Sequence, residues 1–235
     1  EEFPIFREFW LVRPKRNDKS VTVYALLDSP SAAGIYTFVI TPGENTVMDV
    51  DAKIFPRKEI NKLGIAPLTS MYLFGENTKN KFDDHRPEVH DSDGLLVLNG
   101  NGEWLWRPLD NSKYLRISAF VDENPKGFGL LQRDREPAHY LDFEANYEQR
   151  PSAWVEPVGD WGKGWIELVE IPSQQEIHDN VVAYWVPREK AVPQKELHYR
   201  YRLYWRSKKF PATLPPPIPE SAAYPACWKI TNANS

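Results

Sequence analysis

The sequence predicts an all-β protein built as a sandwich or barrel. Apolar and polar residues alternate with a period of two through segments rich in β-branched and aromatic side chains. Proline, glycine, asparagine and aspartate bound these segments, as they do at turns between strands. Helical periodicity is weak throughout. Many short strands separated by turn residues favour a sandwich or barrel over other all-β arrangements.

The first three strands are expected at residues 21–27, 35–40 and 46–55. Turns separate them at residues 28–30, Asp-Ser-Pro, and at residues 42–43, Pro-Gly. Further strands are expected, from the same alternation, at residues 94–98, 103–107, 114–121, 128–132, 164–171, 181–186 and 196–205.

One short helix is expected at residues 138–149. Tyr140, Phe143 and Tyr147 recur there three and four residues apart, which places them on one helical face. Pro151 ends the segment, because the residue before a proline is disfavoured in the helical region. We therefore expect a single helix beside the strands.

Length and composition exclude several classes of protein. The 235 residues have room for one domain of ordinary size or two small ones, and 41% hydrophobic with 26% charged residues indicates a globular chain. The net charge of −4 argues against nucleic-acid binding. No apolar run approaches the roughly 18 residues of a membrane span. The single cysteine, Cys227, excludes an internal disulfide framework and a cysteine-based zinc site.

The two ends of the chain are unusual. It opens with Glu1-Glu2-Phe3 rather than methionine, which indicates a processed product or a fragment. The segment from residue 211 to 235 contains the proline-rich run 214–219 and lacks strand or helix periodicity. We expect this proline-rich tail to be irregular and poorly packed.

Metal and cofactor sites are not predicted. His85, His90, Asp91 and Asp93 are possible ligands, and Asp-x-Asp-Gly resembles the start of a calcium loop. The later ligand positions are missing, however, because an apolar run follows Gly94. A solvated turn therefore explains the segment better. No glycine-rich loop opens a helix, so a nucleotide cofactor is not predicted either.

Paired carboxylates and many tryptophans suggest carbohydrate chemistry. Asp91 and Asp179 each follow a histidine and lie near an apolar strand, where a carboxylate would be held rigidly. Glycoside hydrolysis needs one acid to protonate the leaving oxygen and one base to activate water. Indole rings suited to stacking on sugars are supplied by Trp104, Trp106, Trp154, Trp161, Trp165 and Trp185. The alternative is that these rings fill the core of the sandwich.

Long segments, in order, also resemble the periplasmic glucan biosynthesis proteins of the MdoG/OpgG and OpgD family. The likeness covers about residues 1 to 205. The matching segments are residues 1–4, 9–10, 25–30, 66–74, 86–94, 100–109, 127–133, 150–157, 159–164, 167–172 and 179–185. Strings of this length and order are far more specific than a short motif.

The resemblance implies a fold and a compartment. Family members are periplasmic and have a large N-terminal β-sandwich similar to galactose mutarotase and other carbohydrate-handling sandwiches. An immunoglobulin-like C-terminal domain follows. Residues 1–210 then correspond to the C-terminal half of the sandwich domain, residues 211–235 match nothing in the family, and the immunoglobulin-like domain is absent. Such a half-sandwich would leave open sheet edges, so we expect the chain alone to be poorly soluble and inactive.

The resemblance also implies an activity, an inverting endo β-1,2-glucanase with Asp179 as general acid and Asp91 on the base side. Glu176 and Tyr147 match residues that line the same cleft. Residues expected to bind substrate are Trp104, Trp106 and Arg107. The implied partners are β-1,2-glucan and other periplasmic glucan biosynthesis proteins, and no cofactor is implied. The alternative is a non-catalytic carbohydrate-binding factor in glucan backbone synthesis.

The two proposed roles require different environments for the aspartates. A general acid must stay protonated until it is used, so we expect burial to raise the pKa of Asp179. The base-side Asp91 must stay ionised, helped by Ser92 or Arg86. Only the enzyme requires both carboxylates to face one cleft. Carboxylates on opposite sheet faces would favour the binding factor.

Overall fold

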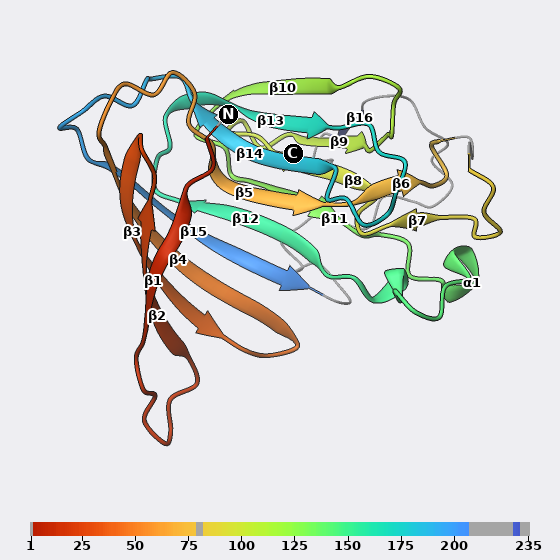
Figure 1. The fold of residues 1–235 in the computed structure, drawn as a ribbon, viewed down its shortest axis with the longest axis horizontal. Helices are drawn as coiled ribbons and strands as arrows, with labels where there is room; N and C mark the ends of the chain where they lie inside the picture. The colour runs from red at the N-terminus through yellow and green to blue at the C-terminus, as the bar shows by residue number, and fades with distance from the viewer. Residues whose placement is uncertain (1, 79–81, 207–227, 231–235) are drawn as a thin grey trace, which may run out of the picture.

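A computed structural model of the chain is almost entirely β-structure, as the sequence predicts (Figure 1). It describes residues 2–78 and 82–206 and the backbone of residues 228–230. Within those residues there are three sheets, and every strand pair in them is antiparallel. No helix among them has the length and apolar character needed to cross a membrane.

The largest sheet has ten strands and runs along the molecule (Figure 1). In spatial order its strands are β1 (Ile5–Leu11), β2 (Val21–Asp28), β3 (Ala32–Thr41), β4 (Asn45–Pro56), β15 (Leu197–Arg206), β12 (Ser152–Val158), β11 (Gly127–Leu131), β8 (Gly94–Leu98), β9 (Trp104–Pro108) and β16 (Trp228–Ile230). The longest pairing joins β4 to β15, which are far apart in sequence.

A four-stranded sheet packs on the central part of the large one and completes a sandwich. Its strands are β10 (Arg116–Glu123), β13 (Lys163–Glu170), β14 (Val181–Pro187) and β5 (Ile65–Ser70), in that spatial order. The main core lies between the sheets, where Phe128 and Leu130 of the large sheet belong to one cluster with Ile166, Leu168 and Trp185. All five side chains are at most 1% exposed. The sandwich expected from the sequence is thus confirmed.

A second cluster, containing Trp104, lies on the large sheet and depends on glycines opposite tryptophans. A Cβ at Gly94 would stand 2.1 Å from the Trp106 ring, and one at Gly127 would stand 2.1 Å from the Trp154 ring. These glycines leave room for the indoles to lie flat on neighbouring strands. Trp104, Trp106 and Trp154 pack there and are at most 3% exposed.

The first strand, by contrast, contributes no fully buried side chain. All seven residues of β1 are exposed, and among the described strands β1 pairs with β2 alone, at the edge of the large sheet. Phe9, Trp10 and Leu11 keep 62%, 49% and 68% of their surface exposed. We call β1 with these side chains the apolar edge.

The expected helix is divided in two. It consists of α1 (Pro137–Tyr140) and a 3₁₀ turn, η1 (Tyr147–Gln149). Between them Leu141 and Asn146 both have φ of 51°, in the left-handed region that ends a helix.

Several strands were not expected from the sequence. These are β1, β5, β12 and the two-stranded sheet of β6 (Tyr72–Phe74) and β7 (Val89–His90). The proline-rich tail, expected at residues 211–235, lies outside the described residues except for β16, which pairs with β9.

Candidate functional site

The backbone of Met71 and Tyr72 brings the two candidate aspartates to one end of the sandwich. The Asp91 amide donates to the Met71 carbonyl oxygen at 2.8 Å. Asn180 is 3% exposed, and its side chain accepts from the Tyr72 amide at 2.8 Å and donates to the Tyr72 carbonyl at 2.9 Å. Asp91 and Asp179 are therefore anchored to consecutive residues, although 88 positions separate them in the sequence.

Asp91 is a partly buried carboxylate that forms an ion pair with Arg150. Its side chain is 27% exposed, and Oδ1 lies 3.1 Å from Nε of Arg150. Burial raises the pKa of Asp91, Arg150 opposes that shift, and the negative charge of Asp179 adds to it. The charge of Asp179 thus acts on Asp91, which brings the two carboxylates into one electrostatic environment.

The environments of the aspartates differ from those expected. Asp179 is exposed, so the expectation of a buried general acid at this position is wrong for the structure described. Arg86 and Ser92 were expected to assist Asp91. Instead Ser92 accepts from Ser70 at 2.8 Å, and the cation beside Asp91 is Arg150.

Glu176 and Tyr147 meet beside the aspartates. The Tyr147 hydroxyl donates to Glu176 Oε2 at 2.9 Å, and burial raises the pKa of Tyr147 so that it stays protonated. The guanidinium of Arg150 lies 5.7 Å from the Tyr147 ring centre, so the same arginine contacts Asp91 and Tyr147. Four residues predicted from the sequence therefore gather at one place, which we call the aspartate site: Asp91, Tyr147, Glu176 and Asp179.

Arg86 joins three segments next to the aspartate site. Its Nη1 donates to Glu176 at 2.9 Å and to Asp142 at 2.6 Å, while Nη2 donates to Asp84 at 2.7 Å. Hydrogen bonds that Arg86 donates to Asp84 and Asp142 raise the pKa of Arg86, so it remains charged. Sequence reasoning did not find this role. The signal available was its position among aspartates in residues 83–93.

A buried polar cluster lies beneath the site and consists of Glu88, His90, Asp93 and Gln132. His90 is 1% exposed, with Nε2 2.7 Å from Glu88 and Nδ1 2.9 Å from Gln132 Oε1. Burial disfavours the charged ring, but the hydrogen bond to Glu88 and the charge of Asp93 outweigh it and raise the pKa of His90. Since both partners accept, both ring nitrogens donate, as in an imidazolium.

The buried polar cluster is connected to the aspartate site through Gln132. Its Nε2 lies 3.0 Å from the carbonyl oxygen of Tyr147 and 2.9 Å from that of His90. Asp93 accepts from the Arg133 amide at 2.9 Å. The cluster therefore fixes the backbone that carries Tyr147.

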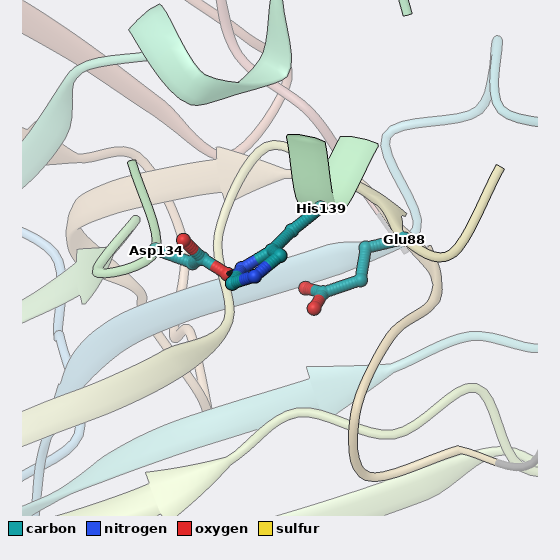
Figure 2. A group of neighbouring side chains, drawn as sticks. All are labelled: Glu88, Asp134 and His139. Carbon is teal, nitrogen blue, oxygen red and sulfur yellow. Dashed lines mark hydrogen bonds and ion pairs between the residues drawn. The ribbon is translucent and has the colours of Figure 1, made fainter. Parts of the chain in front are cut away.

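Three side chains near the buried polar cluster have the donor atoms of a metal site. Ligand atoms of Glu88, Asp134 and His139 all lie within 4.8 Å of one another (Figure 2). Carboxylates and imidazole are donors that suit zinc. His139 Nδ1 is already 2.6 Å from Asp134 Oδ2, and Glu88 is bonded to His90, so these existing bonds account for the positions of the side chains.

The three remaining predicted residues lie elsewhere. Trp104 and Trp106 are 3% and 2% exposed, so neither ring offers a free face for sugar stacking, and the alternative that they fill a core describes them better. Arg107 donates to Glu170 at 3.2 Å and is not among the residues of the aspartate site.

Comparison of the sequence with known proteins identifies a family. Residues 1–223 match the model of the family described as "Periplasmic glucan biosynthesis protein, MdoG". The chain is 58% identical over 205 residues to "Glucans biosynthesis protein G" of Shewanella baltica OS155, covering 87% of this chain and 38% of the relative.

Other relatives have the same name. The protein of Pseudomonas paraeruginosa is 58% identical over 87% of this chain and 39% of its own length. That of Shewanella frigidimarina is 57% identical over 88% of this chain and 37% of its own length. The chain therefore spans less than two fifths of the relatives it matches.

Proposed function

The chain belongs to the MdoG family of periplasmic glucan biosynthesis proteins, and on that premise we propose that it acts in the periplasm on the β-1,2-glucan backbone. The proposed reaction is endo-hydrolysis with inversion, with Asp179 as the general acid and Asp91 on the base side. The proposed partners are β-1,2-glucan and other proteins of glucan biosynthesis.

The observation that carries this proposal is that Asp91 and the neighbour of Asp179, Asn180, bond to the backbone of the consecutive residues Met71 and Tyr72. Asp91 senses the charge of Asp179, and Glu176 with Tyr147 lies next to them. An inverting glycosidase needs two carboxyl groups that face one substrate from opposite sides of the scissile bond. This arrangement favours the enzyme over a non-catalytic binding factor.

The environments also suggest how the two roles divide. Asp179 is exposed, so a glucan chain lying over it would exclude water from this carboxyl group only in the bound state. Arg150 at 3.1 Å favours the ionised form of Asp91, as a base requires. A second candidate reverses the roles, because burial raises the pKa of Asp91 in the chain as described.

The test is incubation of the intact protein with linear β-1,2-glucan, reading product length by chromatography and product anomer by NMR. Cleavage with inversion gives the α-anomer at the new reducing end. Asp91→Asn and Asp179→Asn are each expected to reduce the rate at least about 100-fold. The matched control is Asp160→Asn, an exposed aspartate in the turn between β12 and β13, which should retain full rate. Binding without cleavage by the unaltered protein would support the binding factor instead.

A second experiment assigns the roles. Loss of the general acid is tolerated when the leaving group needs no proton, so an Asp179→Asn enzyme should recover activity on an aryl β-1,2-gluco-oligosaccharide. Loss of the base is compensated by a small nucleophile, so an Asp91→Asn enzyme should recover activity with azide. The opposite pattern of rescue would establish the reversed roles.

A further inference from the structure

An open hollow of about 620 Å³ lies beside the aspartate site, between residues 83–86 and residues 141–144. At its wall Phe143 is 96% exposed, so the phenyl ring contributes almost nothing to the packing of the fold. Single exposed apolar residues are common and need no explanation on their own. This one is distinguished by the way its backbone is held.

The loop that carries Phe143 is held in place on both sides of the ring. Asp142 Oδ1 accepts from the amides of Glu144 and Ala145 at 2.8 and 2.7 Å. The Leu141 amide donates to the Pro137 carbonyl at 3.1 Å. Leu141 has φ of 51°, which is unfavourable for a side chain of this size. The structure thus holds Phe143 in an unusual loop that presents its ring to solvent.

The same loop is tied directly to the aspartate site. Arg86 Nη1 donates to Asp142 Oδ2 at 2.6 Å and to Glu176 Oε2 at 2.9 Å, so a single nitrogen joins the Phe143 loop to Glu176. Tyr147 donates to that same Glu176 oxygen. A long ligand leaving the aspartate site in this direction would therefore reach the hollow.

We propose that Phe143 and the hollow form a sugar-binding subsite for a glucan unit beyond those at the scissile bond. This inference rests on the proposed function. A glucose unit has flat C–H faces that pack on an aromatic ring and hydroxyl groups that bond to polar side chains, and the hollow supplies both. Its lining carries four carboxylates against one arginine, which disfavours an anionic ligand and suits a neutral one.

The test measures binding by calorimetry of the intact protein to linear β-1,2-gluco-oligosaccharides of graded length. Phe143→Ala should weaken binding of long oligosaccharides about fivefold to tenfold and leave short ones unchanged, because only long chains reach the ring. Phe143→Tyr should restore most of the loss. Because Phe143 is 96% exposed, these changes leave the fold intact. The matched control is Phe3→Ala, at a phenylalanine 81% exposed before β1, which should alter no affinity.

The outcomes separate this subsite from the proposed function. Equal binding of long oligosaccharides by Phe143→Ala and the unaltered protein, with cleavage still dependent on Asp91, overturns the subsite alone. Failure of the unaltered protein to bind any β-1,2-glucan overturns the proposed function and the subsite with it. An equal loss of affinity for oligosaccharides of every length also overturns the subsite. It would mean that Phe143 contacts the sugar units that even the shortest oligosaccharide contains. A length-dependent loss restored by tyrosine supports it.

Discussion

The apolar edge exposes apolar side chains to water, whereas the buried polar cluster keeps polar side chains away from it. On β1, Phe9 and Leu11 leave 62% and 68% of their surface in solvent. In the buried polar cluster, Glu88, His90 and Gln132 are 6%, 1% and 2% exposed. Hydrophobic stabilisation scales with apolar surface removed from water, so the apolar edge contributes little to the folded chain.

The difference teaches where single substitutions will act. A buried charge is stable only while its partner remains, and removing the partner leaves an uncompensated charge in the interior. Removing an exposed ring leaves no cavity and no unpaired charge, because water already surrounds the ring. Stability should therefore depend strongly on the polar residues under the site and weakly on the aromatic residues of β1, the reverse of what their hydrophobicity alone suggests.

The largest effect is expected at His90. His90→Ala leaves Glu88 buried without its 2.7 Å partner, which should cost about 3–5 kcal/mol of unfolding free energy in urea denaturation. The control is His198→Ala, whose side chain is 42% exposed and paired with Asp51 across the large sheet. It should cost less than about 1 kcal/mol. Equal losses at the two histidines would remove the distinction between buried and exposed pairs.

The same cluster gives a pH dependence with a defined sign. The pKa of His90 is raised in the fold, so its contribution to stability is complete below the ordinary histidine value of 6.5 and is lost as pH rises through the folded value. Unfolding free energy measured from pH 6 upward should decline in the unaltered chain. The decline should be smaller in His90→Gln, which has no titrating ring.

The next largest effect is expected at Arg86. Arg86→Met leaves Asp84, Asp142 and Glu176 without their shared cation, which should cost about 2–3 kcal/mol and lower the cleavage rate proposed above. The matched control is Arg202→Met, whose side chain is 44% exposed and pairs with Asp49 at 2.7 Å. It should cost less than about 1 kcal/mol. Thermal denaturation of both variants provides the measurement.

The elements of the fold differ in how well the sequence predicts them. Alternation located β2, β3, β4 and β15 to within a few residues, because each strand is long and regular. It did not locate β5, where Ala66 has φ of 50° and Pro67 interrupts the pattern. The helix expected at residues 138–149 was too long, because periodicity does not reveal the left-handed residues that divide it.

The aspartate site was predicted in part. Family resemblance located Asp91, Tyr147, Glu176 and Asp179, which the structure brings together. Their burial was not predictable, because it depends on loops joined by Asn180 across more than 100 positions. The aromatic residues near the motifs were misleading. A tryptophan on a strand has the same sequence pattern whether it faces a sugar or packs over a glycine such as Gly94.

A smaller effect is expected on the apolar edge. Phe9→Ser should change the unfolding free energy by less than about 1 kcal/mol, because most of the ring is already in water. It should also raise solubility by removing an apolar group from an exposed strand. Phe128→Ser, at a fully buried position in the sandwich core, is the contrast and should cost more than about 3 kcal/mol. A comparable cost at Phe9 would mean that another part of the protein covers β1.

The smallest effect is expected at Asp91, and it has the opposite sign. Burial raises the folded pKa of Asp91 above its unfolded value, so ionisation opposes folding as pH rises through the folded value, and the penalty is complete above it. Asp91→Asn should therefore raise the melting temperature at pH 7 while reducing the proposed cleavage at least about 100-fold, and the gain in melting temperature should disappear below the unfolded pKa. Asp160→Asn, at an exposed position, should leave the melting temperature unchanged at both pH values. A lower melting temperature for Asp91→Asn at pH 7 would mean that the 3.1 Å pair with Arg150 outweighs burial. The charge of Asp91 would then stabilise the fold instead of being kept at a cost in stability.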